Sequence, residues 1–423
     1  MSEQMKTTEN GNWLLRILLT FGPGIFCVGY TIGTGSATSM IVAGAEYGMS
    51  LLWVLILSCL FSGVLMEAYG RFAIVSGKTS ISMFRSEFGR FFAILVALMI
   101  VLGQWTCLSG LVGLSSGAVV EGVRMFFPGV NHQSIVITAA VLLLVSYLLL
   151  WFGNYKRIET VLVLLVTIMA LAFMLSLFYV PPSGIQIVKG FVPYWPNTAN
   201  EYLMVAAFVG TTMAAPTFIV RPILLKAKGW TVADRALQTK DVIVSALLMF
   251  IVSASIMACA TGAILNRGGQ PIESINDMVE TLRPLAGDFA AGVFILGAIA
   301  AGLSSLFPIV MVAPLMIADF RGEGLNAQTR TFRILAAVAC LIGMTVPILG
   351  ANPVFVQVLT QVSQVFVLPL VIGGIFVLVN RSSVMGEYRA GYLLNLGLIF
   401  SFIFSLGISY CGVVAIYQIF TAG

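Results

Sequence analysis

Two apolar stretches of the chain each contain a short run of residues that an α-helix does not sustain well. Residues Thr31–Ser36 include two glycines among hydroxyl-bearing side chains, and Met213–Thr217 includes Pro216. Glycine and proline both weaken a helix, so each run is a candidate helix break. A break at bilayer depth leaves backbone N–H and C=O groups that only an enclosed, hydrated or ligand-filled cavity can satisfy. Together the two runs predict a binding site halfway across a membrane.

The side chains at these breaks could recognise a solute through neutral hydrogen bonds. Hydroxyls and amides supply donors and acceptors, and unwound backbone carbonyls add further acceptors. Hydroxyls within apolar helices usually donate to their own backbone, so we expect about half of them to be structural. The candidate binding residues, which include two glutamines from a later stretch, are Thr31, Gly33, Thr34, Ser36, Thr212, Ala214, Thr217, Gln361 and Gln364, with Thr211 in the same ring.

Composition places the elements that carry these residues in a membrane. Apolar residues make up 59% of the 423 positions and charged residues 9%, against about 45–50% and about 25% in soluble proteins. A spanning helix needs roughly 20 mostly apolar residues. Eleven stretches are candidates, which predicts an all-α membrane protein. Their approximate ranges are 13–42, 49–70, 92–127, 134–152, 159–180, 201–225, 241–265, 288–319, 331–350, 354–379 and 391–419.

A short polar tail and a single transmembrane domain are expected. Residues 1–12 form the tail, and residues 13–423 form the domain, because its longest polar stretches are too short to bury a core of their own. The first apolar stretch is too long, and lacks the cleavage pattern, for a removable signal peptide. The breaks fall in the first and sixth stretches, so two sets of five spans are followed by one extra helix. Five spans per half give the halves opposite orientations, which predicts an inverted repeat.

Lysine and arginine residues predict the orientation. If the N-terminus is cytoplasmic, the outer side keeps only Arg124, Lys189, Arg267 and Arg283 of the 22 basic residues, and Arg221 lies within a helix. The positive-inside rule therefore predicts a multi-pass plasma-membrane protein with a cytoplasmic N-terminus and an external C-terminus. The basic loops explain the net charge of +5 without a nucleic-acid partner. The cytoplasmic set is Lys6, Arg16, Arg71, Lys78, Arg85, Arg90, Lys156, Arg157, Lys226, Lys228, Arg235, Lys240, Arg321, Arg330, Arg333, Arg381 and Arg389.

Other kinds of chemistry have little support in the sequence. The six cysteines all lie in apolar stretches and form no Cys-x-x-Cys pair, so we interpret them as packing residues. The polar segments contain no nucleophile–base pair, phosphate loop or dinucleotide fingerprint. We therefore expect no enzymatic activity and no cofactor, and the expected partners are a small solute and the lipid bilayer.

Each break also has a purely structural explanation. Gly29 and Gly33 are four residues apart, a spacing that often serves close helix packing in membranes. Pro216 could simply kink its helix. The matching positions of the two breaks in the two halves favour a binding site over these explanations.

Longer motifs resemble one family of membrane proteins. Phe21–Gly24, followed by Ala43–Gly48 and Leu51–Trp53, resembles the first-span region of the Nramp divalent-metal transporters. Gly297–Ser305 is similar to that family's eighth-span motif, and Gln361–Glu387 is similar to its tenth span and following loop. The resemblance covers nearly the whole chain. It implies the leucine-transporter-like architecture of the APC superfamily, with eleven transmembrane helices, a 5+5 inverted repeat with broken helices 1 and 6, and alternating access.

The residues that bind metal in this family are changed here. On ungapped alignment Gly33–Ser36 stands at the family's Asp-Pro-Gly-Asn motif, and Ala214–Pro216 stands at its Met-Pro-His. The family's second histidine of the sixth span falls on Arg221. Its acidic pair of the third span falls in the neutral stretch Gly110–Gly117, and its second glutamine of the tenth span falls on Val367. The resemblance therefore implies the transporter fold without the usual metal ligands.

These changes disfavour a proton-driven manganese importer. A thioether beside a carboxylate selects Mn²⁺ and Fe²⁺ over Mg²⁺ and Ca²⁺, and a dehydrated divalent ion among neutral oxygens recovers little of its desolvation cost. Histidine titrates near neutral pH, but the single histidine, His132, lies in a predicted outer loop. Hydrated Mg²⁺ suits outer hydrogen bonds because Mg²⁺ dehydrates reluctantly. The chain looks most like the Nramp-related magnesium transporters, a branch that departs from the family in a similar way.

Two charged residues within spans are further candidates. Glu67 aligns with a family glutamine in the second span, and an intramembrane carboxylate is a functional candidate; the alternative is a pair with a nearby basic residue. Arg221 follows the sixth-span break by five residues, about 7 to 8 Å along a helix. If Arg221 faces the site it repels cations and attracts anions, whereas it has no such effect if it extends to the cytoplasm or pairs with Glu67.

Three functional hypotheses follow. The leading one is a transporter or facilitator of a divalent cation, most plausibly hydrated Mg²⁺ and alternatively Mn²⁺, by alternating access without obligatory proton coupling. The second is a carrier of an organic or anionic solute on the same scaffold, which depends on Arg221 and on the absence of carboxylates at the site. The third is a receptor-like protein that has kept the fold and lost transport; the absence of an appended signalling domain disfavours it.

Overall fold

The computed structural model describes residues 22–125, 127, 129, 133–152, 155–179, 181–263, 275–322 and 328–422. This part of the chain is almost entirely helical. Within it, ten segments of 19 to 35 residues are long and apolar enough to cross a membrane. The first predicted span corresponds to a pair of shorter helices that precede these ten. Each of the eleven predicted spans thus has a counterpart, and residues 13–21 of the first lie outside the described part.

The spanning elements keep the predicted order along the chain. Their bounds are α2 (Gly22–Thr31) with α3 (Thr34–Tyr47), α4 (Leu52–Ser76), α6 (Arg90–Arg124), α7 (Gln133–Phe152), α8 (Tyr155–Tyr179), α10 (Ala199–Thr212) with α11 (Ala215–Lys228), α12 (Arg235–Ala263), α13 (Ile275–Arg321), α14 (Arg330–Gly343) with α15 (Thr345–Leu349), α16 (Pro353–Val365) with α17 (Leu368–Asn380), and α19 (Tyr392–Ala422). The short elements between spans are α5 (Ser80–Glu87), α9 (Gly184–Lys189), α18 (Ser382–Met385) and the 3₁₀ helices η1 (Val232–Asp234) and η3 (Gly386–Tyr388).

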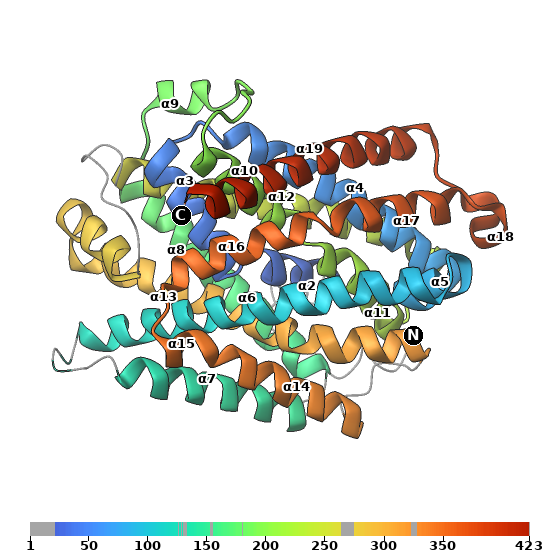
Figure 1. The fold of residues 1–423 in the computed structure, drawn as a ribbon, viewed down its shortest axis with the longest axis horizontal. Coiled ribbons are helices and arrows are strands. Elements are labelled where there is room, and N and C mark those ends of the chain that lie inside the picture. The colour runs from blue at the N-terminus through green and yellow to red at the C-terminus, as the bar shows by residue number, and fades with distance from the viewer. Residues whose placement is uncertain are drawn as a thin grey trace, which may run out of the picture.

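The loops fall at two opposite ends of the helix bundle. In Figure 1 most spanning helices run along the long axis of the molecule, with α5 and α18 at one end and α9 at the other. α5 follows the second span and α18 the tenth, whereas α9 follows the fifth. An even number of spans returns the chain to its starting side, so this arrangement agrees with the predicted alternation of the loops.

Both predicted helix breaks are present. Between α2 and α3 the backbone leaves the helical region at Gly33, where φ is −92° and ψ is −169°. Between α10 and α11 it leaves the helix at Met213, with ψ of 45°, and at Ala214, with ψ of 109°. Each break frees backbone groups inside the bundle, as the sequence predicted.

Pro216 starts a helix and does not kink one. It lies in the first turn of α11, whose N-cap is Ala214. Proline is favoured there because its fixed φ suits the first turn and its missing N–H would have no intrahelical partner. The kink explanation of Pro216 is therefore wrong, and the proline helps to separate the sixth span into two half-helices.

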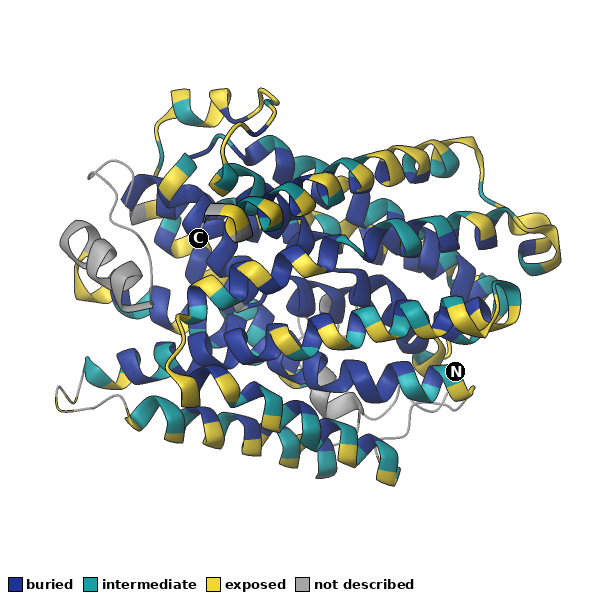
Figure 2. Ribbon diagram, viewed as in Figure 1, coloured by how far each residue is buried: buried dark blue, intermediate teal, exposed yellow. Residues whose placement is uncertain are grey.

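Burial separates the helices around the breaks from those at the periphery. In the most apolar 18-residue window of each span, 94% of the residues are buried for Ala199–Lys228, against 22% for Gln133–Trp151. Figure 2 shows buried residues through the middle of the molecule and exposed ones along its outer helices. α10 and α11 thus form the centre of the bundle, where neighbouring helices cover the unwound backbone.

Glycines allow the close contacts on which this centre depends. A Cβ at Gly210 of α10 would lie 2.0 Å from the carbonyl oxygen of Gln361 in α16, and a Cβ at Gly33 would lie 1.9 Å from Ser305 Oγ of α13. A Cβ at Gly29 would approach Val166 of α8 to 2.9 Å. The packing explanation of Gly29 and Gly33 is therefore correct, but Gly33 also forms part of the break itself.

Candidate functional site

A small cavity lies where the two broken spans meet three other helices. Its walls come from α2 and α3, from the junction of α10 and α11, and from α6, α13 and α16. Its volume is about 20 Å³, enough for one water molecule, which needs about 10–15 Å³ by this measure. The lining residues are Tyr30, Thr31, Gly33, Gly35, Ser36, Gln104, Cys107, Leu111, Thr211, Ala214, Ser305, Ile309, Gln357 and Gln361.

Five of the nine binding residues predicted from the sequence line this cavity. They are Thr31, Gly33, Ser36, Ala214 and Gln361, and Thr211 of the same predicted ring joins them. The backbone of the two breaks thus brings together segments that are about half a chain apart. Whether these residues bind a substrate remains a prediction.

Three of the other predicted residues, Thr212, Thr217 and Gln364, are not among the described residues that line the cavity. Thr212 donates its hydroxyl to the carbonyl of Phe208 at 2.9 Å, which is the structural role expected for part of this set. The hydroxyl oxygen of Thr217 lies 3.5 Å from that of Thr31. Gln364 packs one α16 turn beyond Gln361 and faces Gly103 of α6. The side chain of Thr34 lies outside the described part of the chain.

Residues that the sequence analysis missed complete the wall. Tyr30 donates its hydroxyl to Gln104 Oε1, so α2 and α6 are linked across the cavity. Gln357 could have been found, because it precedes Gln361 by four residues and therefore shares its helix face. Ser305 of α13 donates to the carbonyl of Gly29 at 2.7 Å. Ser305 belongs to the motif that resembles the family's eighth span, but no periodicity in the sequence indicated that it contacts the first break.

Cys107 is an exception to the packing interpretation of the cysteines. All six cysteines are free, but Cys107 is among the residues that line the cavity, and its Sγ atom accepts hydrogen bonds from Gln357 Nε2 and Gln361 Nε2, both at 3.3 Å. This placement puts one soft, polarizable atom among oxygen and nitrogen groups. The interpretation as a mere packing residue is therefore wrong for Cys107.

Two polar atoms of the cavity wall have no hydrogen-bond partner in the described part of the chain. They are Ser36 Oγ and Gln357 Oε1, and both residues are buried, with 1% and 0% exposure. A buried polar atom without a partner costs about 1–3 kcal/mol. Both residues are among those that line the cavity, so a small rotation of either side chain would let a guest or a water molecule there satisfy these atoms.

Among the described residues that line the cavity there is no carboxylate or imidazole. Nor do the described residues contain a group of three or more histidine, cysteine or acidic side chains that could hold a metal ion. The donors around a guest are therefore hydroxyl, amide and carbonyl groups, with the thiol of Cys107. His132 lies outside the described part of the chain.

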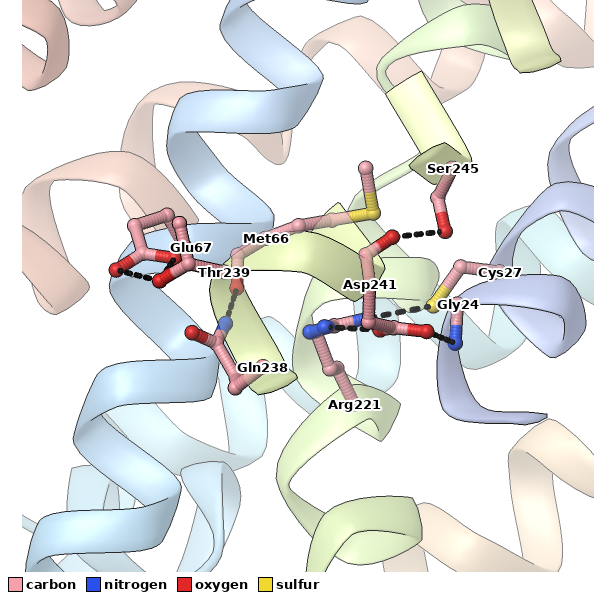
Figure 3. A network of polar contacts seen from close by, with 9 residues as sticks. All are labelled: Gly24, Cys27, Met66, Glu67, Arg221, Gln238, Thr239, Asp241 and Ser245. Carbon is pink, nitrogen blue, oxygen red and sulfur yellow. Dashed lines mark hydrogen bonds and ion pairs between the residues drawn. The ribbon is translucent and has the colours of Figure 1, made fainter. Parts of the chain in front are cut away.

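Arg221 is buried in an ion pair and does not line the cavity. Its Nη2 atom lies 2.6 Å from Asp241 Oδ2, and neither side chain is exposed. Asp241 also accepts the backbone N–H of Gly24 at 3.0 Å, and Arg221 Nη1 lies 3.8 Å from Cys27 Sγ. Figure 3 shows this network joining α2, α11 and α12. The sequence analysis missed Asp241, which lies at the edge of an apolar stretch.

Glu67 pairs with a neighbour on its own helix. Arg71 Nη2 lies 3.1 Å from Glu67 Oε1, and Thr239 of α12 donates to Glu67 Oε2 at 3.2 Å. The proposed alternative of a nearby basic partner is therefore correct, whereas the suggested pair with Arg221 is wrong. Glu67 is not among the residues that line the cavity.

Two broken spans that face one small polar cavity, in a bundle of this order, define the class of secondary transporters. Comparison with known protein families identifies the family. The chain belongs to the natural resistance-associated macrophage protein-like (Nramp) family, whose model matches residues 24–415. It is thus a multi-pass membrane protein of a transporter family and not an enzyme.

Relatives and solved structures agree with this assignment. The divalent metal cation transporter MntH of Verminephrobacter eiseniae is 27% identical over 88% of this chain and 84% of that protein. The protein of the same name from Vibrio campbellii is 25% identical over 88% and 86%. A manganese transporter of Eremococcus coleocola, in complex with an aromatic bis-isothiourea substituted compound, has a TM-score of 0.70 at 16% identity, covering 97% of this chain and 96% of that one.

A further solved structure has a similar fold. MhsT in complex with L-phenylalanine has a TM-score of 0.65 at 16% identity, covering 94% of this chain and 98% of that one. The predicted fold class, a leucine-transporter-like bundle with broken first and sixth spans, is therefore confirmed.

Proposed function

We propose that this protein moves a divalent cation across the membrane by alternating access, with Mg²⁺ as the preferred ion and without obligatory proton coupling. Membership of the Nramp family and the names of its MntH relatives support a divalent cation. The observation that carries the proposal is that two residues lining the cavity between the breaks, Ser36 and Gln357, each carry a buried side-chain oxygen without a hydrogen-bond partner in the described part of the chain.

Neutral oxygens suit an ion that keeps water. Mg²⁺ dehydrates reluctantly and usually retains several waters in protein sites. Hydroxyl and amide oxygens can accept hydrogen bonds from those waters, and no carboxylate is needed to replace them. The cavity of about 20 Å³ is smaller than the roughly 60–90 Å³ that six waters need by the same measure. The hydrated ion therefore requires a more open conformation, with the half-helices moved apart.

Mn²⁺ is the second candidate, and one observation favours it. Cys107 Sγ lines the cavity, and sulfur is a softer ligand than oxygen. A thiol from α6 could take the place of the soft ligand that the family carries in the sixth span. The choice between Mg²⁺ and Mn²⁺ depends on whether this sulfur contacts the ion.

An organic or anionic substrate has less support. That hypothesis depended on a free Arg221, but Asp241 neutralises this side chain at 2.6 Å and no wall of the cavity includes it. Proton coupling also lacks a carrier among the described residues of the site, because none of those that line the cavity is a carboxylate or an imidazole.

Flux into proteoliposomes tests the proposal. We expect Mg²⁺ uptake above that of empty vesicles, reported by an enclosed fluorescent indicator, with weaker Mn²⁺ uptake. Cys107→Ser should leave the KM for Mg²⁺ unchanged. A several-fold increase in the KM for Mn²⁺ alone, with Mn²⁺ the better substrate of the wild type, would instead identify a manganese transporter. Absence of uptake of either ion would overturn the proposal.

A further inference from the structure

A groove much larger than the central cavity opens between α4, α12 and the beginning of α19. Its volume is about 770 Å³, within the range of small-molecule binding sites. It shares no lining residue with the cavity at the breaks. Most of its wall is aliphatic or aromatic, and exposed side chains such as Leu60, Ile243 and Leu247 form its rim. The groove is therefore a separate site on the lipid-facing surface.

Four polar side chains gather at one end of this groove. Glu67 and Arg71 come from the second half of α4, and Arg235 and Thr239 come from the beginning of α12. These parts of the two helices lie at the end of the bundle that carries α5, because α5 directly follows α4. That end is predicted to be cytoplasmic. The groove thus runs from an apolar region at bilayer depth to charges at the predicted inner surface.

The charged side chains at this end of the groove can attract an anion. Glu67 pairs with Arg71 at 3.1 Å and accepts from Thr239, as Figure 3 shows for Glu67 and Thr239. Arg71 Nε is buried and has no hydrogen-bond partner in the described part of the chain. Arg235 is exposed and forms no ion pair with any described carboxylate. Two guanidinium groups and one carboxylate give this end a net charge of +1.

We propose that the groove binds an anionic phospholipid of the inner leaflet. An acyl chain would lie along the apolar wall, and the phosphate would accept hydrogen bonds from the guanidinium groups of Arg71 and Arg235. Guanidinium groups bind phosphate through short, charge-assisted hydrogen bonds, and basic sites between spans at the cytoplasmic surface are suited to anionic headgroups. A zwitterionic lipid offers the same phosphate but also a cation, which the net charge of +1 disfavours. The inference does not depend on which ion the protein transports.

Two substitutions should change the lipid preference in opposite directions. Arg235→Gln removes the unpaired cation, so we expect retention of phosphatidylglycerol by the purified protein to fall about fivefold, the effect of one basic charge near an anionic surface. Glu67→Gln removes the compensating carboxylate and should increase retention. The measurement is native mass spectrometry after exchange with phosphatidylglycerol or phosphatidylcholine. Retention of phosphatidylcholine should change little in either variant.

A control and a variant of the apolar wall complete the test. Arg389→Gln removes an exposed charge at the same end of the molecule, outside the groove, and should have no effect. Gly63→Ile should lower retention of both lipids, because a Cβ at Gly63 makes only an ordinary contact at 3.4 Å with Ala246 and its extension fills the groove. Equal retention of both lipids by the wild type, or an equal effect of Arg389→Gln and Arg235→Gln, would overturn the proposal.

Discussion

Single side chains decide what the central cavity can recognise. Its wall offers hydroxyls, amides and one thiol, and two of its buried oxygens, Ser36 Oγ and Gln357 Oε1, lack partners in the described part of the chain. Such atoms reduce stability unless a water or a guest satisfies them. The cavity is thus polar at a cost in stability, which is typical of a binding site and not of a packing centre.

Replacing Gln357 should separate function from stability. In Gln357→Leu the unpartnered oxygen is lost, so we expect thermal stability in detergent to stay equal or rise by about 1 kcal/mol. Uptake of the transported ion should nevertheless fall at least tenfold, because a hydrogen-bonding group of the site is gone. Proteoliposome flux and a thermal-shift assay measure the two effects.

Gln364 provides the matched comparison. It is buried on the same helix, and neither atom of its amide has a partner in the described part of the chain, but it does not line the cavity. Gln364→Leu should gain stability in the same way and keep wild-type uptake. Loss of uptake in Gln364→Leu equal to that in Gln357→Leu would show that the cavity described here is not the site.

The Arg221–Asp241 pair should matter for stability more than any surface pair. Removing one partner of a buried pair leaves an uncompensated charge and costs about 3–5 kcal/mol, so Arg221→Met should strongly lower the melting temperature. The double variant Arg221→Met/Asp241→Asn should recover most of the loss, since the asparagine oxygen can still accept the N–H of Gly24.

An exposed ion pair supplies the reference for that measurement. Arg381 pairs with Glu87 while 45% of its side chain is exposed, and exposed pairs contribute about 0–1 kcal/mol. Arg381→Gln should therefore change the melting temperature little. If the double variant at Arg221 and Asp241 is no more stable than Arg221→Met, the buried charge is not the cause of the destabilisation.

Among the secondary-structure elements, the proposed transport depends most on the two broken helices. The first and sixth spans are each interrupted near their middle, and the first break contacts α13 so closely that no side chain fits at Gly33. Ser305 fixes this contact by donating to the carbonyl of Gly29 at 2.7 Å. The break of the first span is therefore held by α13 as well as by its own sequence.

A methyl group at Gly33 should impair transport. In Gly33→Ala the new Cβ would lie 1.9 Å from Ser305 Oγ and 2.5 Å from Ser305 Cβ, so α2, α3 and α13 cannot keep their present packing. We expect uptake to fall at least tenfold while the protein still reaches the membrane. The double variant Gly33→Ala/Ser305→Gly should recover part of the flux, because it removes the opposing side chain.

Gly117 of α6 is a suitable control for the loss of a helical glycine. A Cβ there meets no atom within 4 Å, so Gly117→Ala should have wild-type uptake. No rescue by Ser305→Gly would contradict a steric clash with Ser305 as the cause, because the extended backbone of Gly33 is open to alanine as well.

The predicted orientation of the whole helix bundle can be tested from either side of the membrane. The loops alternate between two ends of the bundle, and the lysine and arginine count predicts which end is cytoplasmic. Lys189→Cys, at the end of α9, should react with a membrane-impermeant maleimide from outside intact cells, whereas Arg85→Cys in α5 should react only after permeabilisation. The reverse pattern would show that the predicted orientation is wrong.

Coupling of ion uptake to proton movement is also a property of the whole molecule. A transported proton needs a titratable group that changes its charge during the cycle, and the part of the cavity wall that the structure describes contains neither carboxylate nor imidazole. We therefore expect uptake of the transported ion to proceed without acidification of the vesicle interior, monitored with an enclosed pH dye. Stoichiometric acidification that requires the transported ion would contradict the prediction.

Much of the architecture could be predicted because bilayer physics acts on local sequence. Span length, loop charge and helix-breaking residues are read from neighbouring positions, and they predicted the order of the spans and both breaks. Partners across the bundle could not be predicted in this way. Arg221 and Asp241 lie on consecutive spans, and Cys107 and Gln357 are 250 residues apart, so no periodicity within one helix indicates either contact.

The amino-acid sequence by itself determined that this is a membrane bundle with two interrupted spans, because apolar length and helix propensity are local properties. Only the tertiary structure decided which polar groups face the cavity. Thr212 and Gln364 do not line the cavity, Cys107 does, and Arg221 is neutralised by Asp241. These outcomes depend on how helices from different parts of the chain rotate and pack against one another. The sequence thus specifies where a site can form, and packing specifies which atoms form it.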